Sequence, residues 1–349
     1  MINKHNIIKE NQRKTLYDPN LAEYLNKKVE EEKRRKELEK KLGKGIEEIK
    51  EKEEENLEKK IEDMGEIIGL KEVGRKEHPK IVRGVCFSPD GRYIATGCVD
   101  KYLRIFEISK NHNKLELNQI LEEEHPNWVN GVSFSPDGRY IASGCWDNYL
   151  RIFEIINDHD KIGLNQDPIL GKHPNGVEGV SFSPDWRYIA TGCYDGCLRI
   201  YGIINNPDKI ELNLNPISEE KHPDTVYGVS LSPDGRYIAT GCFDGSLRIY
   251  GIINNPDKIK LNPKPILKKH LYRIMGVSFS PDGRYIATGC KDNYLRIFEI
   301  SKTHNKLELN RKPILEEEHP NSVYGVCFSP DGRYIATGCY DGFLRIFKI

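Results

Sequence analysis

Residues 88–98 of the chain read SPDGRYIATGC, and the same phrase returns, with one or two substitutions, from Ser135, Ser183, Ser232, Ser280 and Ser329. Successive copies begin 47 to 49 residues apart. Self-similarity at a fixed period of this size is the signature of repeated supersecondary units, in which loops absorb small differences in length. The chain is therefore predicted to contain six structural repeats.

Each unit has the pattern of short strands joined by turns. Residues 125–155 read HPNWVNGVSFSPDGRYIASGCWDNYLRIFEI, and KIGLNQDPIL follows shortly after them. An apolar strand leads into the SPDG turn, where Pro and Gly favour a tight reversal, and two further strands flank the turn around Asp147. With KIGLNQDPIL as a fourth strand, the unit matches a β-propeller blade, whereas ankyrin-like or tetratricopeptide repeats would show a helical periodicity that is absent.

The predicted fold is thus an all-β propeller over residues 67–349, with six four-stranded blades. The units lie near residues 78–121, 125–170, 173–217, 222–267, 270–315 and 319–349. The last unit has only three strands, whereas residues 67–79 align with the fourth-strand segment 114–126 of the first unit. We expect residues 67–73 to pair with the last blade, a velcro-type closure that would remove two exposed sheet edges.

Residues 1–66 differ sharply in composition from the rest of the chain. They hold 17 Lys or Arg and 18 Asp or Glu, with many Glu–Lys pairs at a spacing of four residues. Good helix formers with such pairs predict two helices, at about 19–42 and 46–64, separated by Gly43-Lys44-Gly45. Two interpretations remain open: a solvated charged helix or helical hairpin that acts as a spacer, and a weak coiled coil through residues 19–64 that self-associates or binds a helical partner.

The bulk properties favour an intracellular protein, and we expect a cytoplasmic location, with the nucleus also compatible. The chain has 349 residues, 30% of them charged, and its mean hydropathy is -0.62. It shows neither a candidate transmembrane stretch nor an apolar secretory signal at its start. Six of the nine cysteines occupy one repeat position, which indicates small half-buried thiols rather than a disulfide framework or a zinc site.

The units share further residues that resemble one known family. Each unit has a His before its first strand, then FSPDG or a close variant, an A-T/S-G triplet and an Asp. This pattern is similar to that of the WD-repeat β-propellers, and the resemblance covers residues 67–349. In that family a His, a Ser or Thr, an Asp and a Trp form a hydrogen-bonded tetrad in each blade. The resemblance implies the following structural His-Thr/Ser-Asp sets: His78, Thr96 and Asp100; His125, Ser143 and Asp147; His173, Thr191 and Asp195; His222, Thr240 and Asp244; His270, Thr288 and Asp292; His319, Thr337 and Asp341.

The fourth member of the tetrad departs from the family pattern. The Trp position is filled by Phe106, Phe153, Tyr201, Tyr250, Phe298 and Phe347. Phe cannot donate the hydrogen bond that an indole would, so we expect a His-Thr-Asp triad in four blades, while the two Tyr hydroxyls are able to serve as replacements.

The repeated polar residues argue against catalysis. A catalytic site is usually unique, whereas the His, Thr and Asp sets recur in every unit, so we expect them to be structural, with no catalytic residues, metal site or cofactor. An Arg also recurs in each unit, and we expect it to be solvated. Residues 67–349 carry 36 basic and 35 acidic side chains, so no net field favours nucleic acid, and no membrane partner is expected either.

The informative positions are those at which the units disagree. Three stand out in each unit: the residue before the Asp, and the two residues that flank the first apolar residue of the first strand. In WD-repeat proteins the matching positions lie on one face around the channel mouth, which we call the top face. The candidate partner-binding residues are Arg83, Trp128, Asn130, Trp146, Glu178, Tyr194, Tyr227, Phe243, Arg273, Met275, Lys291, Tyr324 and Tyr340.

Aromatic residues, Arg and Met are enriched at binding hot spots, so we predict a non-enzymatic interaction scaffold. Its partner would be a peptide or loop that combines apolar and acidic residues. Two alternatives stay open: a multivalent small-ligand or carbohydrate binder, and a propeller enzyme with its site in the channel mouth, where Glu178 is the only carboxylate among the variable positions.

Trp186 replaces the Gly of the SPDG turn, and we expect it to disfavour the turn and to expose its indole.

Overall fold

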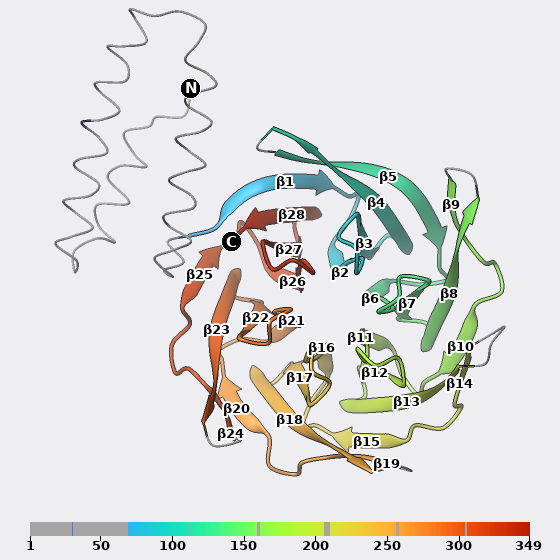
Figure 1. The fold of residues 1–349 in the computed structure, drawn as a ribbon, viewed down its shortest axis with the longest axis vertical. Coiled ribbons are helices and arrows are strands. Elements are labelled where there is room, and N and C mark those ends of the chain that lie inside the picture. The colour runs from blue at the N-terminus through green and yellow to red at the C-terminus, as the bar shows by residue number, and fades with distance from the viewer. Residues whose placement is uncertain are drawn as a thin grey trace, which may run out of the picture. The chain divides into compact units, whose positions relative to one another are not determined.

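The computed structural model describes Glu30 and residues 69–112, 114–158, 161–205, 210–255, 258–303 and 306–349. Apart from Glu30, the helices predicted at 19–42 and 46–64 lie outside these residues. The described part from residue 69 onward forms six antiparallel sheets arranged as blades around a common centre (Figure 1). The predicted six-bladed β-propeller is confirmed. Within the described ranges, no helix is long and apolar enough to cross a membrane.

The first three strands of every blade follow the predicted order outward from the centre. The innermost strands are β2 (Val82–Phe87), β6 (Val129–Phe134), β11 (Val177–Phe182), β16 (Val226–Leu231), β21 (Ile274–Phe279) and β26 (Val323–Phe328). The second strands are β3 (Tyr93–Cys98), β7 (Tyr140–Cys145), β12 (Tyr188–Cys193), β17 (Tyr237–Cys242), β22 (Tyr285–Cys290) and β27 (Tyr334–Cys339). The third strands are β4 (Tyr102–Asn111), β8 (Tyr149–Asp158), β13 (Cys197–Asn205), β18 (Ser246–Asn255), β23 (Tyr294–Thr303) and β28 (Phe343–Lys348).

The core consists of apolar layers between neighbouring blades. Val129, Val132 and Phe134 of the second blade pack against buried residues of the first blade, among them Leu103 and Ile105. The same kind of layer joins the sixth blade to the first, so the apolar packing continues around the ring. Because each layer needs both of its blades, no blade can bury its apolar face alone.

The fourth strand is the main departure from the predicted blade. It is undivided in the first blade, as β5 (Lys114–Glu124), and in the sixth sheet, where the strand Lys71–Glu77 takes the outermost place. In the next four blades it is divided into two short strands, and each of them pairs with a different part of the long third strand. These pairs are β9 (Lys161–Leu164) and β10 (Ile169–Lys172), β14 (Ile210–Leu212) and β15 (Ser218–Lys221), β19 (Lys258–Leu261) and β20 (Ile266–Lys269), and β24 (Lys306–Leu309) and β25 (Leu315–Glu318).

A local turn explains the division in the second blade. Asn165 Oδ1 accepts a hydrogen bond of 3.0 Å from the amide of Asp167, and Pro168 then lacks the amide hydrogen that a ladder needs. The corresponding segment of the first blade has neither the Pro nor the extra residues, so β5 bridges the same place with a bulge opposite Ile105 and Phe106. Alignment of the repeated units alone could not reveal this difference between the blades.

The first strand of the propeller lies beside the last. β1 (Lys71–Glu77) pairs antiparallel with β28, with Lys71 opposite Lys348 and Glu77 opposite Phe343 (Figure 1). The strand therefore begins and ends four residues later than the predicted segment 67–73. Its Val73 is buried in the apolar layer between the sixth and first blades.

The expectation for Trp186 was wrong in one respect, because its indole is half-buried. The backbone adopts φ 64°, close to the φ 72° of Gly138 at the equivalent turn, so the left-handed turn is kept at a conformational cost. The ring packs edge-on against Tyr140 of the neighbouring blade at 5.4 Å and against Phe182 at 5.3 Å between centroids. Aromatic packing between blades thus offsets the unfavourable turn conformation.

Candidate functional site

The His and hydroxyl groups form a buried pair in every blade but the fifth. In five blades the His Nε2 lies 2.8 to 3.0 Å from the Ser or Thr oxygen. The fifth blade differs, since His270 Nε2 and Thr288 Oγ1 both lack a hydrogen-bond partner. Every His ring contacts the aromatic ring at the former Trp position, with centroids 5.0 to 5.6 Å apart. Of the two Tyr candidates, Tyr250 lies within 3.3 Å of His222 Nε2.

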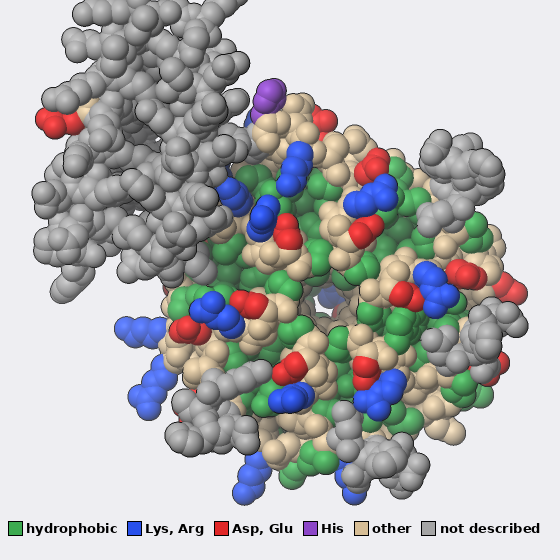
Figure 2. Space-filling model, in the orientation of Figure 1, with side chains coloured by type: hydrophobic (Ala, Val, Ile, Leu, Met, Phe, Trp, Pro, Cys, Tyr) green, Lys and Arg blue, Asp and Glu red, His purple; other side chains and the backbone are tan. Residues whose placement is uncertain are grey.

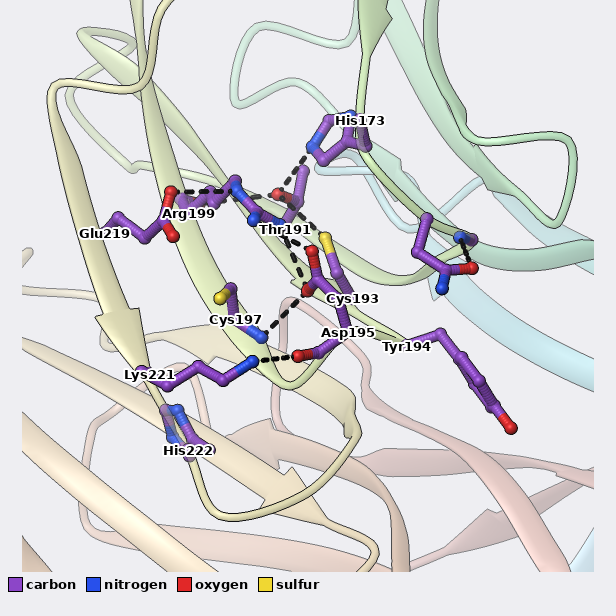
Figure 3. A network of polar contacts seen from close by, with 12 residues as sticks. His173, Thr191, Cys193, Tyr194, Asp195, Cys197, Arg199, Glu219, Lys221 and His222 are labelled. Carbon is purple, nitrogen blue, oxygen red and sulfur yellow. Dashed lines mark hydrogen bonds and ion pairs between the residues drawn. The ribbon is translucent and has the colours of Figure 1, made fainter.

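The Asp of each unit pairs with the recurring Arg. Figure 3 shows the third blade, where Arg199 contacts Asp195 at 2.8 Å and Glu219 at 3.1 Å, while His173 approaches Thr191 instead. The equivalent Asp–Arg ion pair is present in all six blades, at 2.5 to 2.8 Å. The expectation of solvated Arg side chains was therefore wrong: they are buried or nearly so, because the paired carboxylate compensates the guanidinium charge.

These polar groups are poorly suited to acid–base or nucleophilic chemistry. Burial lowers the pKa of each of the six His rings to about 4, so they are neutral at physiological pH. Burial also raises the pKa of the six recurrent thiols to about 11 or 12. A neutral thiol is a weak nucleophile, and no group of His, Cys, Asp and Glu suited to a metal ion is found among the described residues.

The turn that carries the Arg-paired Asp brings two of the variable positions of each blade together. In the second blade the amide of Trp146 donates to the carbonyl of Trp128 at 2.9 Å, and the equivalent bond is present in all six blades. The residue before the Asp therefore lies beside the residue before the innermost strand, although 18 positions separate them in the sequence. Figure 3 shows Tyr194 projecting away from the buried network, so this position is free to vary without disturbing the blade.

Three aromatic residues of the second and third blades form a continuous cluster. The rings of Trp128 and Trp146 lie 5.8 Å apart, and Trp146 meets Tyr194 edge-on at 4.8 Å. Trp128 is 39% exposed and Tyr194 is 46% exposed, whereas Trp146 is half-buried between them. This part of the top face offers aromatic surface held in place by ring packing.

A second set lies on the fourth to sixth blades. Tyr227 stacks with Phe243 at 6.3 Å, and the Arg273 guanidinium lies 3.5 Å from the Phe243 ring centroid. Tyr324 stacks with Tyr340 at 6.2 Å, and Tyr340 is 49% exposed. Met275 is buried and Lys291 is exposed. Aromatic and basic groups therefore alternate on this side.

The channel mouth holds a polar network that joins three blades. Arg83 donates to Asn130 Oδ1 at 2.8 Å and to Glu178 Oε2 at 3.2 Å. Its guanidinium also lies 5.2 Å from the Tyr324 ring and 5.8 Å from the Trp128 ring, which connects the two aromatic sets. Burial raises the pKa of the Glu178 carboxyl, and Arg83 opposes this shift. Asn130 and Glu178 are buried, so they support the face rather than cover it.

Two exposed residues of the top face were missed by the sequence analysis. Leu271 is 96% exposed and Tyr272 is 55% exposed, directly before Arg273. Five units continue their His with Pro and then Asn, Asp or Lys, whereas the fifth reads His-Leu-Tyr. Comparing the loop before the innermost strand across the six units would have found this signal.

Six blades with an Asp–Arg ion pair in each, and a His–hydroxyl hydrogen bond in five of them, define a repeat propeller built around structural polar groups. A comparison with protein families finds matches to the WD40 model, described as WD domain, G-beta repeat, at residues 71–107, 116–154, 167–202, 215–251, 261–299 and 311–348. These matches cover more than half of the chain, which therefore belongs to this family. Its propellers are commonly used for protein interaction and are typically non-enzymatic scaffolds. No curated protein matches the chain.

Proposed function

We propose that the top face binds a peptide or loop of another protein, and that the propeller acts as an interaction scaffold. The observation that carries this proposal is the exposure of Trp128, Tyr194, Tyr272 and Tyr340 on one face whose backbone is fixed by repeated hydrogen bonds. Aromatic side chains supply large contact areas at low entropic cost, and a rigid scaffold limits the ordering cost of binding.

The charges around these rings favour an acidic partner. Lys80, Lys101 and Lys291 are exposed in the loops and turns of the top face, and Arg273 lies against Phe243. The Asp residues that follow the variable positions, such as Asp100 and Asp292, are each paired with an Arg, so they add little uncompensated negative charge. An acidic residue next to an apolar one in the partner would complement a basic side chain and its neighbouring ring.

The alternatives have less support. A multivalent small-ligand binder needs the same exposed residues in each unit, but the exposed residues differ while the buried ones agree. An enzyme in the channel mouth would have to use Glu178, whose Oε2 is engaged with Arg83 and whose side chain is buried.

The proposal is tested by truncating the three exposed rings of the variable positions. In the triple variant Trp128→Ala, Tyr194→Ala, Tyr340→Ala we expect affinity for peptides selected from a random display library to fall about 100-fold or more, because each ring is a hot-spot candidate. The melting temperature should change by only about 2 °C, since these side chains are substantially exposed. Isothermal titration and thermal melting measure the two quantities.

The matched control replaces exposed apolar residues outside the top face. Leu214→Ala and Leu267→Ala remove side chains that are 83% and 59% exposed near the outermost strands. Peptide affinity should survive in this variant. Equal losses in both variants, or full affinity in the triple variant, would refute the assignment of the top face.

We further propose that the pairing of β1 with β28 is what closes the ring. Six register positions join the two strands, and Val73 adds apolar contacts with both neighbouring blades. The charged segment 1–66 is proposed to space or tether this propeller.

A further inference from the structure

One position of the innermost strand distinguishes the first and sixth blades from the others. It is the fifth residue of the strand, and across the six units it reads Cys86, Ser133, Ser181, Ser230, Ser278 and Cys327. Four successive blades carry a hydroxyl there, and the two thiols stand at opposite ends of the repeat array. Because the ring is closed, these two ends are neighbours in space.

The serines show where a side chain at this position lies. Ser278 Oγ accepts a hydrogen bond of 3.2 Å from the amide of Phe328 in the next blade, and Ser230 Oγ accepts one of 3.1 Å from Phe279. The side chain thus reaches across to the neighbouring innermost strand. At the boundary between the sixth and first blades, Cys327 occupies the corresponding position, and the thiol of Cys86 is close enough to raise the pKa of the Cys327 thiol well above its usual value.

The two strands are also close enough for a covalent bond between these residues. A Cβ placed on Gly325 would lie 2.9 Å from the carbonyl oxygen of Arg83 and 3.0 Å from the amide of Val85, so β26 and β2 touch there. Cys327 lies two residues after Gly325, and Cys86 lies two residues after Gly84, in the strands that approach each other at these glycines. Disulfides require such an approach, with Cα atoms usually about 4.4 to 6.8 Å apart.

The chemical environment separates this pair from the other seven cysteines. Cys86 and Cys327 are half-buried, whereas the others are buried. The neighbouring Cys327 thiol lowers the pKa of the Cys86 thiol and has its own pKa raised in return, while burial raises the pKa of the six recurrent thiols. Figure 2 shows a hollow at the centre of the ring, onto which the innermost strands border. A small oxidant therefore has access to the pair that it lacks to the buried thiols.

We propose that Cys86 and Cys327 form a site of reversible disulfide formation that joins the first and sixth blades covalently. The oxidant is a peroxide. The Cys86 thiolate attacks one peroxide oxygen, the O–O bond breaks, and the leaving hydroxide takes a proton to become water. The Cys327 thiolate then attacks Cys86 Sγ, the S–O bond breaks, and the second hydroxide takes the proton that Cys327 released. Two thiols lose two electrons in total, and one peroxide is reduced to two waters.

The disulfide would add a covalent link to a ring that is otherwise closed by the pairing of β1 with β28 in the sixth sheet. The polypeptide spans all six blade boundaries, because β1 of the sixth sheet leads directly into β2 of the first, but β28 and β1 are joined only by strand pairing and apolar packing. A bond between residues so distant in sequence constrains the unfolded chain strongly. Oxidation would therefore convert a ring held by non-covalent contacts into a covalently closed one.

The test treats the full-length chain with hydrogen peroxide under native conditions and maps its peptides by mass spectrometry without reduction. We expect a Cys86–Cys327 linked peptide in wild type that dithiothreitol removes, and a melting temperature higher by roughly 5 °C or more in the oxidised protein. Cys86→Ser and Cys327→Ser should lose both effects, and serine at this position already occurs in four blades, so these variants retain the fold.

The control is Cys197→Ser, because the fourth blade carries Ser246 at the equivalent position. This variant should still form the linked peptide and show the same rise in melting temperature. Absence of the linked peptide in wild type, its formation only after unfolding in guanidinium, or a dominant link to another cysteine would overturn the proposal.

Discussion

Acidification from pH 7 to pH 5 is expected to unfold the propeller. Six His side chains are held neutral by burial, with pKa values lowered to about 4, whereas a His in an unfolded chain titrates near 6.5. Below pH 6.5 the His side chains of the unfolded chain take up protons, whereas the same side chains in the folded propeller stay neutral. Stability is therefore complete above pH 6.5 and is lost as the pH falls towards 4.

The size of this effect follows from the number of His residues. Each contributes about 1.4 kcal/mol of lost stability per pH unit in this window, so six together give about 8 kcal/mol per unit. A protein with a total stability of about 5 to 15 kcal/mol should then unfold between about pH 5 and 6. Glu178 acts in the opposite direction, since its raised pKa favours protonation in the folded state, but it is a single group.

Urea unfolding at several pH values between 7.5 and 5.5 measures this dependence. The slope near pH 5.5 should correspond to uptake of about five protons on unfolding. His112→Gln is the control, because His112 is exposed and lies outside the His–hydroxyl pairs. A free energy of unfolding that stays constant down to pH 5 would contradict the buried, neutral state of these rings.

Removal of β1 is expected to have the second largest effect. A chain lacking residues 1–77 loses the partner of β28 and the buried side chain of Val73, and it exposes Arg345, which lies 3.6 Å from Glu72. The lost burial and hydrogen bonds amount to about 5 kcal/mol, which corresponds to a fall in melting temperature of roughly 10 °C or more. The exposed edge of β28 should also promote aggregation.

The control for this deletion is a chain that lacks residues 1–68 and keeps β1. Thermal melting and light scattering should show that this longer chain behaves as the full-length propeller does. If the two truncated chains melted together and both stayed monodisperse, ring closure by β1 would be excluded.

The blades were predictable because their determinants are local and repeated six times. The SPDG turn uses Ser88, whose Oγ donates to Asp90 Oδ1 at 2.6 Å and accepts from the amide of Tyr93 at 2.9 Å, all within six residues. Sequence differences between units also pointed to the residue before the Arg-paired Asp, which is aromatic in four of the six units. By contrast, the division of the fourth strand in four blades coincides with an Asn-x-x-Pro turn, such as Asn165–Pro168, which a repeat comparison treats as a difference in loop length.

Contacts between blades could not be derived in the same way. The link from Arg83 to Glu178 spans two blade boundaries, and the proximity of Cys86 and Cys327 depends on the packing of the sixth blade against the first. The burial of the recurring Arg residues was missed because a guanidinium on a strand appears solvated until its carboxylate partner four residues earlier is placed beside it. Tyr272 and Leu271 were missed because they lie one and two residues before Arg273, the nearest position that was compared.

The central claim, that the top face binds a peptide, is tested most directly by tryptophan fluorescence. The chain has three tryptophans, and Trp186→Phe leaves only Trp128 and Trp146, which stack on the top face. Titration of this variant with a library-selected peptide should change the fluorescence with the same Kd that calorimetry gives. A peptide that binds with that Kd but leaves the emission of both rings unchanged occupies another surface, and this result would contradict the proposed function.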